Sequence, residues 1–162
     1  MIKTAILTIS DKGSRGERVD GTGAALRNLL EEEGYKIEYY NMIPDEINEI
    51  VEELMKASDK LKVDLILTNG GTGFSKRDIT PEATLKVIQK QVPGIPEAMR
   101  TKSLQITSKA MLSRAIAGIR NETLIINLPG SPKGAVENLQ VVMPALKHGI
   151  DILKNKASEC AR

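Results

Sequence analysis

The fold is decided by residues 63–73, which read VDLILTNGGTG. Residues 63–68 are mostly apolar, which is typical of a short strand buried in a sheet. Glycine occupies three of the four positions 70–73, so the backbone there can turn sharply and bring its N–H groups close to an anion. A buried strand that runs directly into such a loop favours an α/β protein with a ligand at the carboxyl end of its strands.

The rest of the chain alternates between strand and helix patterns. The other expected strands are 3–9, 35–43, 115–119 and 123–128. The expected helices are 22–33, one opened by Pro44-Asp45, one capped by Thr80 with Pro81 in its first position, 95–113, and 133–154. This order predicts a three-layer α/β/α sandwich with a mostly parallel mixed sheet, and the hairpin across 120–122 supplies an antiparallel edge. Residues 1–162 are expected to form a single domain with a core of about 3–153.

Three unusual loops follow predicted strands, at 10–20, 69–79 and 129–134. The first is expected to be a polar, glycine-rich loop from Ser10 to about Asp20, either an ordered binding loop or a mobile one. Loops at the carboxyl ends of parallel strands meet at one edge of a sheet. Their coincidence predicts the location of the ligand site. For each loop, the alternative is an ordinary connection or a solvated surface loop.

Composition excludes several classes of protein. The chain is 41% hydrophobic and 27% charged with a net charge of +2, so it lacks the basic footprint of a nucleic-acid-binding protein. Its single Phe, Phe74, and lack of Trp argue against base stacking. No apolar stretch is long enough for a membrane span, and the N-terminus does not resemble a signal peptide. We therefore expect a soluble, cytoplasmic protein.

Histidine and cysteine are too scarce for several kinds of chemistry. The only cysteine, Cys160, is close to the C-terminus, so it cannot form an intrachain disulfide and is not expected to be catalytic. The only histidine, His148, falls in the last predicted helix, where a surface or interface role is favoured. A zinc site and a Ser-His-Asp triad are therefore not expected.

The Gly70–Gly73 loop is a candidate phosphate site. It is neither a Walker A sequence nor a Rossmann fingerprint. Ser75, Lys76, Arg77 and Asp78 follow it, and a helix is predicted to begin near Thr80, so the helix dipole would add to the attraction of an anion. The alternative is a tight strand-to-helix connection without a ligand.

Asp78 and Asp45 are candidate ligands of a divalent cation. A carboxylate near phosphates is expected where Mg²⁺ bridges them. Both residues precede predicted helices, however. Asp78 could instead cap the N–H of Thr80 or a neighbour, and Asp45 could simply favour a helix N-terminus.

Several motifs together resemble one family, the molybdenum-cofactor biosynthesis domain. It is shared by bacterial molybdopterin adenylyltransferase, its MoaB-type paralogue and the G domain of gephyrin. The resemblance covers about residues 3–153. Its matching stretches are Ile9-Ser10-Asp11, Asp20-Gly21-Thr22-Gly23, Pro44-Asp45, Thr68 to Gly73, Arg77 to Ala83, Leu112 to Ala115, and Asn127 to Gly134.

This resemblance implies transfer of an adenylyl group from ATP to the phosphate of molybdopterin, with Mg²⁺, in a homotrimer. It places catalysis and the metal at Asp45 and Asp78. It implies that nucleotide and molybdopterin are bound by Ser10, Asp11, Gly70, Gly71, Thr72, Gly73, Ser113, Arg114, Pro129, Gly130 and Lys133. The metal-inserting enzyme of the pathway is an expected partner. Because the acceptor is already an anion, the reaction needs positioning and charge neutralisation more than a strong base.

Two observations bear on the subfamily. The chain keeps the Arg77-Asp78-Ile79-Thr80-Pro81 pattern of the active type. It lacks an insertion before the last helix that some adenylyltransferases carry, and its compact length is closer to the MoaB type. The alternatives are a non-catalytic molybdopterin-binding or scaffold protein, and a regulatory nucleotide-binding domain. The Asp45 and Asp78 pair favours the enzyme, since a pure binder does not need metal-bridging carboxylates.

Overall fold

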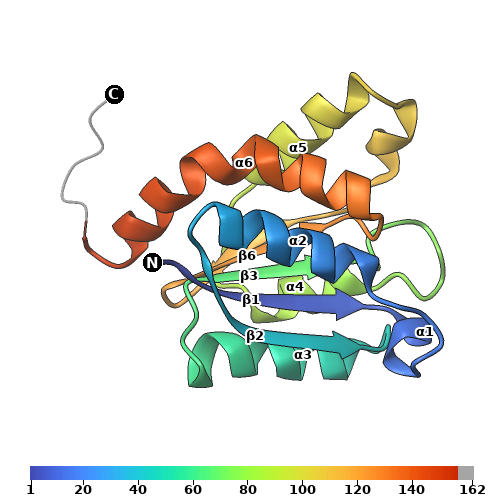
Figure 1. Ribbon diagram of the computed structural model, residues 1–162, viewed down its shortest axis with the longest axis horizontal. Helices are drawn as coiled ribbons and strands as arrows, with labels where there is room; N and C mark the ends of the chain where they lie inside the picture. Colours follow the sequence, from blue (N-terminus) through green and yellow to red (C-terminus); the bar gives the residue numbers. More distant parts are fainter. Residues whose placement is uncertain (157–162) are drawn as a thin grey trace.

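One mixed sheet forms the centre of the protein, seen in a computed structural model that describes residues 1–156 (Figure 1). Its strands, in spatial order, are β2 (Lys36–Ile43), β1 (Lys3–Ile9), β3 (Leu65–Asn69), β6 (Thr123–Leu128), β5 (Ala117–Arg120) and β4 (Lys90–Gln91). The first four are parallel, whereas β5 and β6 form the predicted antiparallel hairpin and β4 pairs antiparallel with β5. The mostly parallel sheet is therefore confirmed.

Helices cover both faces of this sheet and confirm the three-layer sandwich. One face carries α2 (Gly21–Glu32), α5 (Gly94–Leu104) and α6 (Pro132–Leu153), and the other carries α3 (Ile47–Met55) and α4 (Thr80–Val87) (Figure 1). Three shorter helical segments complete the chain: α1 (Asp11–Ser14), the π-helical η1 (Lys56–Lys60) and the 3₁₀-helical η2 (Ser108–Leu112). Among residues 1–156, no helix has the length and hydropathy to cross a membrane.

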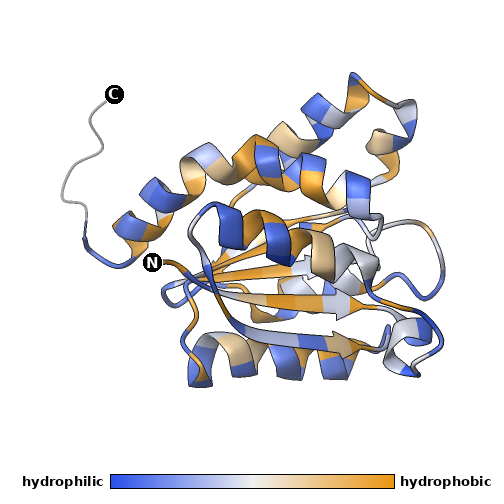
Figure 2. Cartoon of the chain, in the orientation of Figure 1, coloured by the Kyte–Doolittle hydropathy of each residue, from blue (hydrophilic) through white to orange (hydrophobic). Residues whose placement is uncertain are grey.

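The core follows from the alternation of side chains along the central strands. Ile6 and Leu67 pack toward α2, α5 and α6. Their neighbours Leu7 and Ile66 pack toward α3 and α4. Successive residues of a strand point to opposite faces, so a strand that is apolar at nearly every position supplies both layers. Figure 2 shows the apolar residues gathered on these strands and on the helix faces that meet them.

The structure corrects four local expectations. The 10–20 segment is not a loop throughout, because α1 forms within it and Ser10 caps this helix by accepting a hydrogen bond from the Gly13 N–H. Thr80 is the first residue of α4 and does not cap it; its hydroxyl donates to the Gly70 carbonyl at 2.9 Å. The helix predicted over 95–113 breaks between α5 and η2. Strand β4 was not predicted, since two exposed residues carry no periodicity. Cys160 lies outside the described residues.

Candidate phosphate site at the carboxyl edge of the sheet

The three predicted loops meet at one edge of the sheet. Gly70 follows β3 and lies so close to the end of β1 that an added Cβ would be 2.4 Å from the Ile9 carbonyl oxygen. A Cβ on Gly130, after β6, would be 3.3 Å from the Gly70 Cα. The Thr22 hydroxyl joins the start of α2 to this cluster by donating to the Gly130 carbonyl at 2.7 Å. The expected coincidence of the loops is confirmed.

The glycine loop has three consecutive amides without an acceptor among residues 1–156. Gly70 and Gly71 have φ of +96° and +67°, a left-handed conformation that favours glycine. Their carbonyl oxygens accept hydrogen bonds from the side chain and the backbone of Thr80. No acceptor within residues 1–156 pairs with the amides of Gly71, Thr72 and Gly73. Such consecutive unpaired amides are suited to holding phosphate oxygens.

A cavity of about 300 Å³ opens beside this loop. Its lining includes the predicted residues Ser10, Asp45, Gly70, Gly71, Asp78 and Gly130. Helix α2 begins at its rim with Gly21, so the positive end of the helix dipole faces the cavity. Arg18 is the only basic residue among those that line it. The cavity therefore combines the unpaired Gly71 amide, a helix N-terminus and a cation, all of which attract phosphate groups.

Asp45 is a half-buried carboxylate that lines the cavity and does not cap α3. Its Oδ2 accepts a hydrogen bond from the Asp11 N–H at 3.0 Å, while α3 begins at Ile47 without a side-chain cap. No hydrogen bond within residues 1–156 engages Oδ1, which lies 3.2 Å from the Cβ position of Gly71. Burial raises the pKa of the Asp45 carboxyl, and the charges of Asp11 and Asp78 raise it further against the opposing effect of the Asp11 amide and Arg77. A cation at Oδ1 would relieve this cost.

Asp78 also has a different role from the cap that its sequence position allowed. Its Oδ2 accepts from the Ser75 N–H at 3.0 Å, and the Thr80 N–H donates to the Gly71 carbonyl instead. An added Cβ on Gly73 would lie 2.9 Å from this same Oδ2. The glycine loop therefore has Asp45 beside Gly71 and Asp78 beside Gly73.

The residues present fit a magnesium ion that is shared with a substrate. Mg²⁺ in proteins commonly binds one or two carboxylates and completes its shell with water and substrate phosphates. Asp45 and Asp78 line the same cavity. No group of three or more His, Cys, Asp or Glu side chains within residues 1–156 could hold a metal by itself. The donor set suits a metal that enters with nucleotide phosphates.

A buried hydrogen-bond network fixes the floor of the cavity, and the sequence analysis did not identify it. Asp20 accepts through Oδ2 from the hydroxyls of Thr8 and Tyr40 at 2.6 and 2.5 Å, and through Oδ1 from the Gly23 N–H at 2.8 Å. The Asn69 amide donates to Thr8 at 2.9 Å. Burial and the hydrogen bond to Asp20 raise the pKa of Tyr40 to about 12. The Asp20-Gly21-Thr22-Gly23 motif drew attention to Asp20 of this network. No local sequence pattern connected Asp20 with its partners on β1 and β2.

A second cavity, of about 330 Å³, lies on the other side of the glycine loop. Of the predicted residues, Thr72, Gly73, Ser113 and Pro129 line this cavity and not the first. Apolar side chains of α5, η2 and the connection between them form much of the rest: Pro96, Met99, Ile106, Ala110 and Leu112. The site thus has a polar chamber and a more apolar one, with the glycine loop between them.

The remaining predicted residues line neither cavity. The Arg114 guanidinium donates to the carbonyls of Gly73 and Asp78 and pairs with Glu82. It therefore holds the two ends of the segment 73–78 in place. Lys133 is 84% exposed beside Glu137. Asp11 lies behind Asp45, where its carboxylate pairs with Arg77 and its pKa is lowered by that hydrogen bond.

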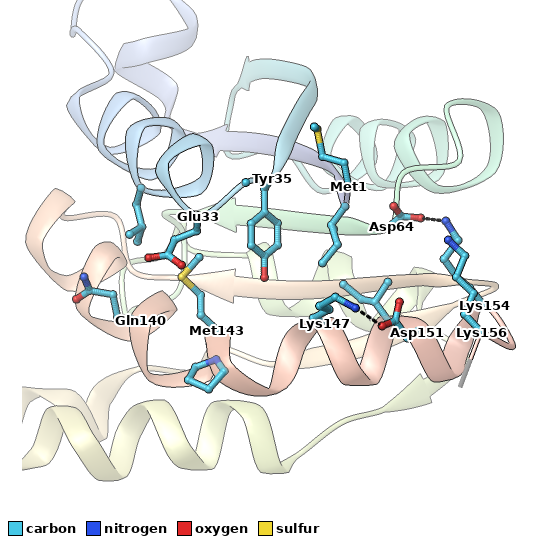
Figure 3. Close-up of a pocket in the computed structure, with 15 residues that line it drawn as sticks. Met1, Glu33, Tyr35, Asp64, Gln140, Met143, Lys147, Asp151, Lys154 and Lys156 are labelled. Carbon is cyan, nitrogen blue, oxygen red and sulfur yellow. Dashed lines mark hydrogen bonds and ion pairs between the residues drawn. The ribbon is translucent and has the colours of Figure 1, made fainter. Parts of the chain in front are cut away.

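A larger cavity, of about 820 Å³, lies at the opposite edge of the sheet (Figure 3). Met1 and Tyr35 line it together with the C-terminal half of α6. Its Lys147 and Lys154 are already paired with Asp151 and Asp64. Gly34 is the one glycine among its described lining residues, so this cavity lacks a glycine loop like that at residues 70–73, and size alone does not identify the candidate site.

The fold and the candidate site together define an α/β domain with a glycine loop and two neighbouring carboxylates at the carboxyl edge of its sheet. A family model described as "Probable molybdopterin binding domain" matches residues 5–148. The chain belongs to this family, as the resemblance of its motifs predicted.

Relatives agree over nearly the whole chain. A Helicobacter pylori protein named molybdopterin adenylyltransferase is 45% identical over 156 residues, which is 94% of this chain and 88% of that protein. Gephyrin from Dictyostelium discoideum is 45% identical over 161 residues, which is 93% of this chain and 22% of gephyrin. The crystal structure of the molybdopterin biosynthesis enzyme MoaB from Thermus thermophilus has a TM-score of 0.92 at 47% identity, covering 98% of this chain and 100% of that one.

Proposed function

We propose that this protein is a molybdopterin adenylyltransferase, which transfers AMP from ATP to the terminal phosphate of molybdopterin. The observation that carries this proposal is the arrangement of the glycine loop. Three unpaired amides, at Gly71, Thr72 and Gly73, lie between two carboxylates, Asp45 and Asp78. Amides hold phosphate oxygens, and paired carboxylates suit a metal that neutralises them. The names of the relatives support the same reaction.

In this reaction an oxygen of the molybdopterin phosphate attacks the α-phosphorus of ATP. The bond from that phosphorus to the β-phosphate oxygen breaks, and pyrophosphate leaves. No strong base is needed, because the attacking phosphate is already an anion. The amides of the glycine loop hold the reacting phosphates in line, and Arg18 and the N-terminus of α2 stabilise the negative charge of the departing pyrophosphate.

Mg²⁺ bound at Asp45 and Asp78 would neutralise charge on the phosphates as it builds toward the transition state. Asp45 contributes Oδ1, which no other residue uses within 1–156. Ser10 and Gly130 complete the polar chamber around the nucleotide, and Asp11 supports Asp45 from behind.

The second cavity is suited to the pterin. Its apolar walls match a flat heterocycle, while Ser113 and Thr72 offer hydroxyls at its edge. The glycine loop between the cavities then places the molybdopterin phosphate next to the nucleotide. Arg114 keeps that loop in shape, and Lys133 contributes positive charge to the surroundings of the site.

The direct test mixes the purified protein with ATP, MgCl₂ and molybdopterin, and measures adenylylated molybdopterin and pyrophosphate together. We expect both products in equal amounts and neither product in EDTA. Retention of molybdopterin without transfer would refute the enzyme and support a non-catalytic, MoaB-type binding protein. Absence of both binding and transfer would refute the whole assignment.

We propose that the protein assembles as a homotrimer. Exposed apolar side chains gather on α5, η2 and the connection between them, where Leu104, Ile106, Met111 and Leu112 are 43% to 63% exposed. Contact between subunits is a common use of such a surface. Sedimentation at micromolar concentration is expected to give three times the chain mass of 17.7 kDa, and a monomer would refute the proposal. We also propose that residues 1–162 form a single domain and that the protein is located in the cytoplasm. Its product would then pass to the metal-inserting enzyme of the pathway.

A further inference from the structure

Arg77 ties together the segments that follow three neighbouring strands. It lies in the loop after β3, and its Nε and Nη2 donate to the two carboxylate oxygens of Asp11, after β1, at 3.0 and 2.9 Å. Nη2 also donates to Glu46, after β2, at 2.8 Å. Because β2, β1 and β3 are adjacent in the sheet, this one side chain spans the edge of the sheet beside the polar cavity.

Asp11 passes this connection on to Asp45. The Asp11 N–H donates to the Asp45 carboxylate, and the Asp45 N–H donates to the Asp11 carboxylate, both at 3.0 Å. Asp11 and Arg77 do not line the polar cavity, whereas Asp45 and Asp78 do. A chain of contacts therefore runs from the loop that carries Asp78, through Arg77 and Asp11, to Asp45.

We propose that Arg77 is a positioning residue, which acts through Asp11 to set the separation of Asp45 and Asp78. Two carboxylates that share a small ion must be held within narrow limits, and a bidentate Arg–carboxylate pair fixes both distance and orientation. This proposal rests on the proposed function. It gives Arg77 a role distinct from the alternative, in which its guanidinium leaves Asp11 and binds a substrate phosphate.

Stability is not the main role of this pair. The Arg77 side chain is 52% exposed and that of its partner Asp11 is 25% exposed, and an ion pair whose arginine is open to solvent contributes little to the free energy of unfolding. Arg77→Lys keeps the charge but loses the two-pronged geometry. We therefore expect this variant to fold and to melt near the wild-type temperature, so that its kinetics report on positioning.

The test compares Arg77→Lys, Asp11→Asn and the double variant, with kcat and the KM for ATP measured for each. We expect kcat to fall by about tenfold to a hundredfold in each single variant, since small misplacements of reacting groups have effects of this size. The KM for ATP should stay within about threefold of wild type. Because the two residues act as one unit, the double variant should be within about threefold of the poorer single variant.

A matched control is available in the same region. Arg15 pairs with Glu17 through the same two-pronged contact, at 3.0 Å for both bonds, and its side chain is 57% exposed. Arg15→Lys makes the same chemical change in a pair that does not reach Asp45. It should keep kcat within about twofold of wild type, which would exclude a general effect of replacing a surface arginine.

The phosphate-binding alternative predicts a different pattern. Arg77→Lys would then raise the KM for ATP with little change in kcat, and Asp11→Asn would free Arg77 and leave the KM unchanged or lower. Effects that multiply in the double variant would likewise overturn the proposal. Failure of the wild-type protein to transfer AMP would refute the proposed function instead. In that event, amide hydrogen exchange tests the positioning role. Residues 71–79 should exchange faster in both single variants than in wild type, and no faster in the double variant than in the single variants. Exchange unchanged from wild type in the single variants would refute the positioning role.

Discussion

Gly71→Ala tests whether the glycine loop holds the phosphates. Gly71 has a φ of +67°, and an added Cβ would lie 2.3 Å from the Thr80 hydroxyl and 3.2 Å from Asp45 Oδ1. The left-handed conformation alone costs an L-residue roughly 1–2 kcal/mol. The short contact forces the loop or Thr80 to move, which breaks the hydrogen bonds that Thr80 makes to the Gly70 and Gly71 carbonyls.

The expected loss in ATP affinity follows from the amides that this movement misdirects. A hydrogen bond to a charged group contributes about 1.5–3 kcal/mol. If two of the three amides lose their contacts, the loss is roughly 3–6 kcal/mol, or at least a hundredfold in Kd. Isothermal titration with ATP and Mg²⁺ measures this directly. Circular dichroism should show an intact fold, since the strain is smaller than a typical free energy of unfolding of about 5–15 kcal/mol.

Gly34→Ala is the matched control for this experiment. Gly34 has a φ of +80° and no atom within 4 Å of an added Cβ, so it carries the same backbone strain without the collision, and it lies after α2, away from the polar cavity. It should lose a similar 1–2 kcal/mol of stability and bind ATP as the wild type does. If Gly71→Ala also kept its ATP affinity while folded, the amides of this loop would not be the phosphate site.

Three further predictions follow from the carboxylates and the network beneath them. Asp78→Asn should lower turnover by roughly a hundredfold or more while molybdopterin binding and melting temperature stay near wild type; turnover within a few-fold of wild type would exclude a metal-binding role. Because burial raises the pKa of Asp45 when folded, its ionisation opposes folding above the ordinary Asp pKa of 3.8. Without metal, the Asp45→Asn variant should therefore have a higher melting temperature than wild type at pH 7. This difference should disappear as the pH falls below 3.8. An equal or lower melting temperature at pH 7 would contradict burial as the cause of the raised pKa. Tyr40→Phe removes one of three donors to Asp20 and should lower the free energy of unfolding by about 1–3 kcal/mol in urea titrations; no change would show that the network does not stabilise the cavity floor.

Local sequence was enough to predict every strand except β4, the layers, and the edge of the sheet where the candidate site lies. Residues 63–73 indicate a buried strand that ends in glycines, and a side chain at every second position of such a strand reaches each helical layer. The hairpin before β6 was predicted from apolar runs on either side of Arg120-Asn121-Glu122. These features depend on residues that are neighbours in the chain, so they can be predicted from hydrophobic periodicity and turn composition.

The roles of the charged residues were decided only by the tertiary structure. From local sequence, Asp78 could have capped a helix and Asp45 could have favoured a helix N-terminus, while the family resemblance implied that Arg114 binds a ligand. In the structure, Asp45 is bound by an amide 34 positions away, and Arg77 pairs with a carboxylate 66 positions away. Such partners are brought together by the order of strands in the sheet, which places the segments after β1, β2 and β3 side by side. The sequence determined which side chains were available at that edge, and the packing of the sheet determined which of them face the cavity and which hold those in place.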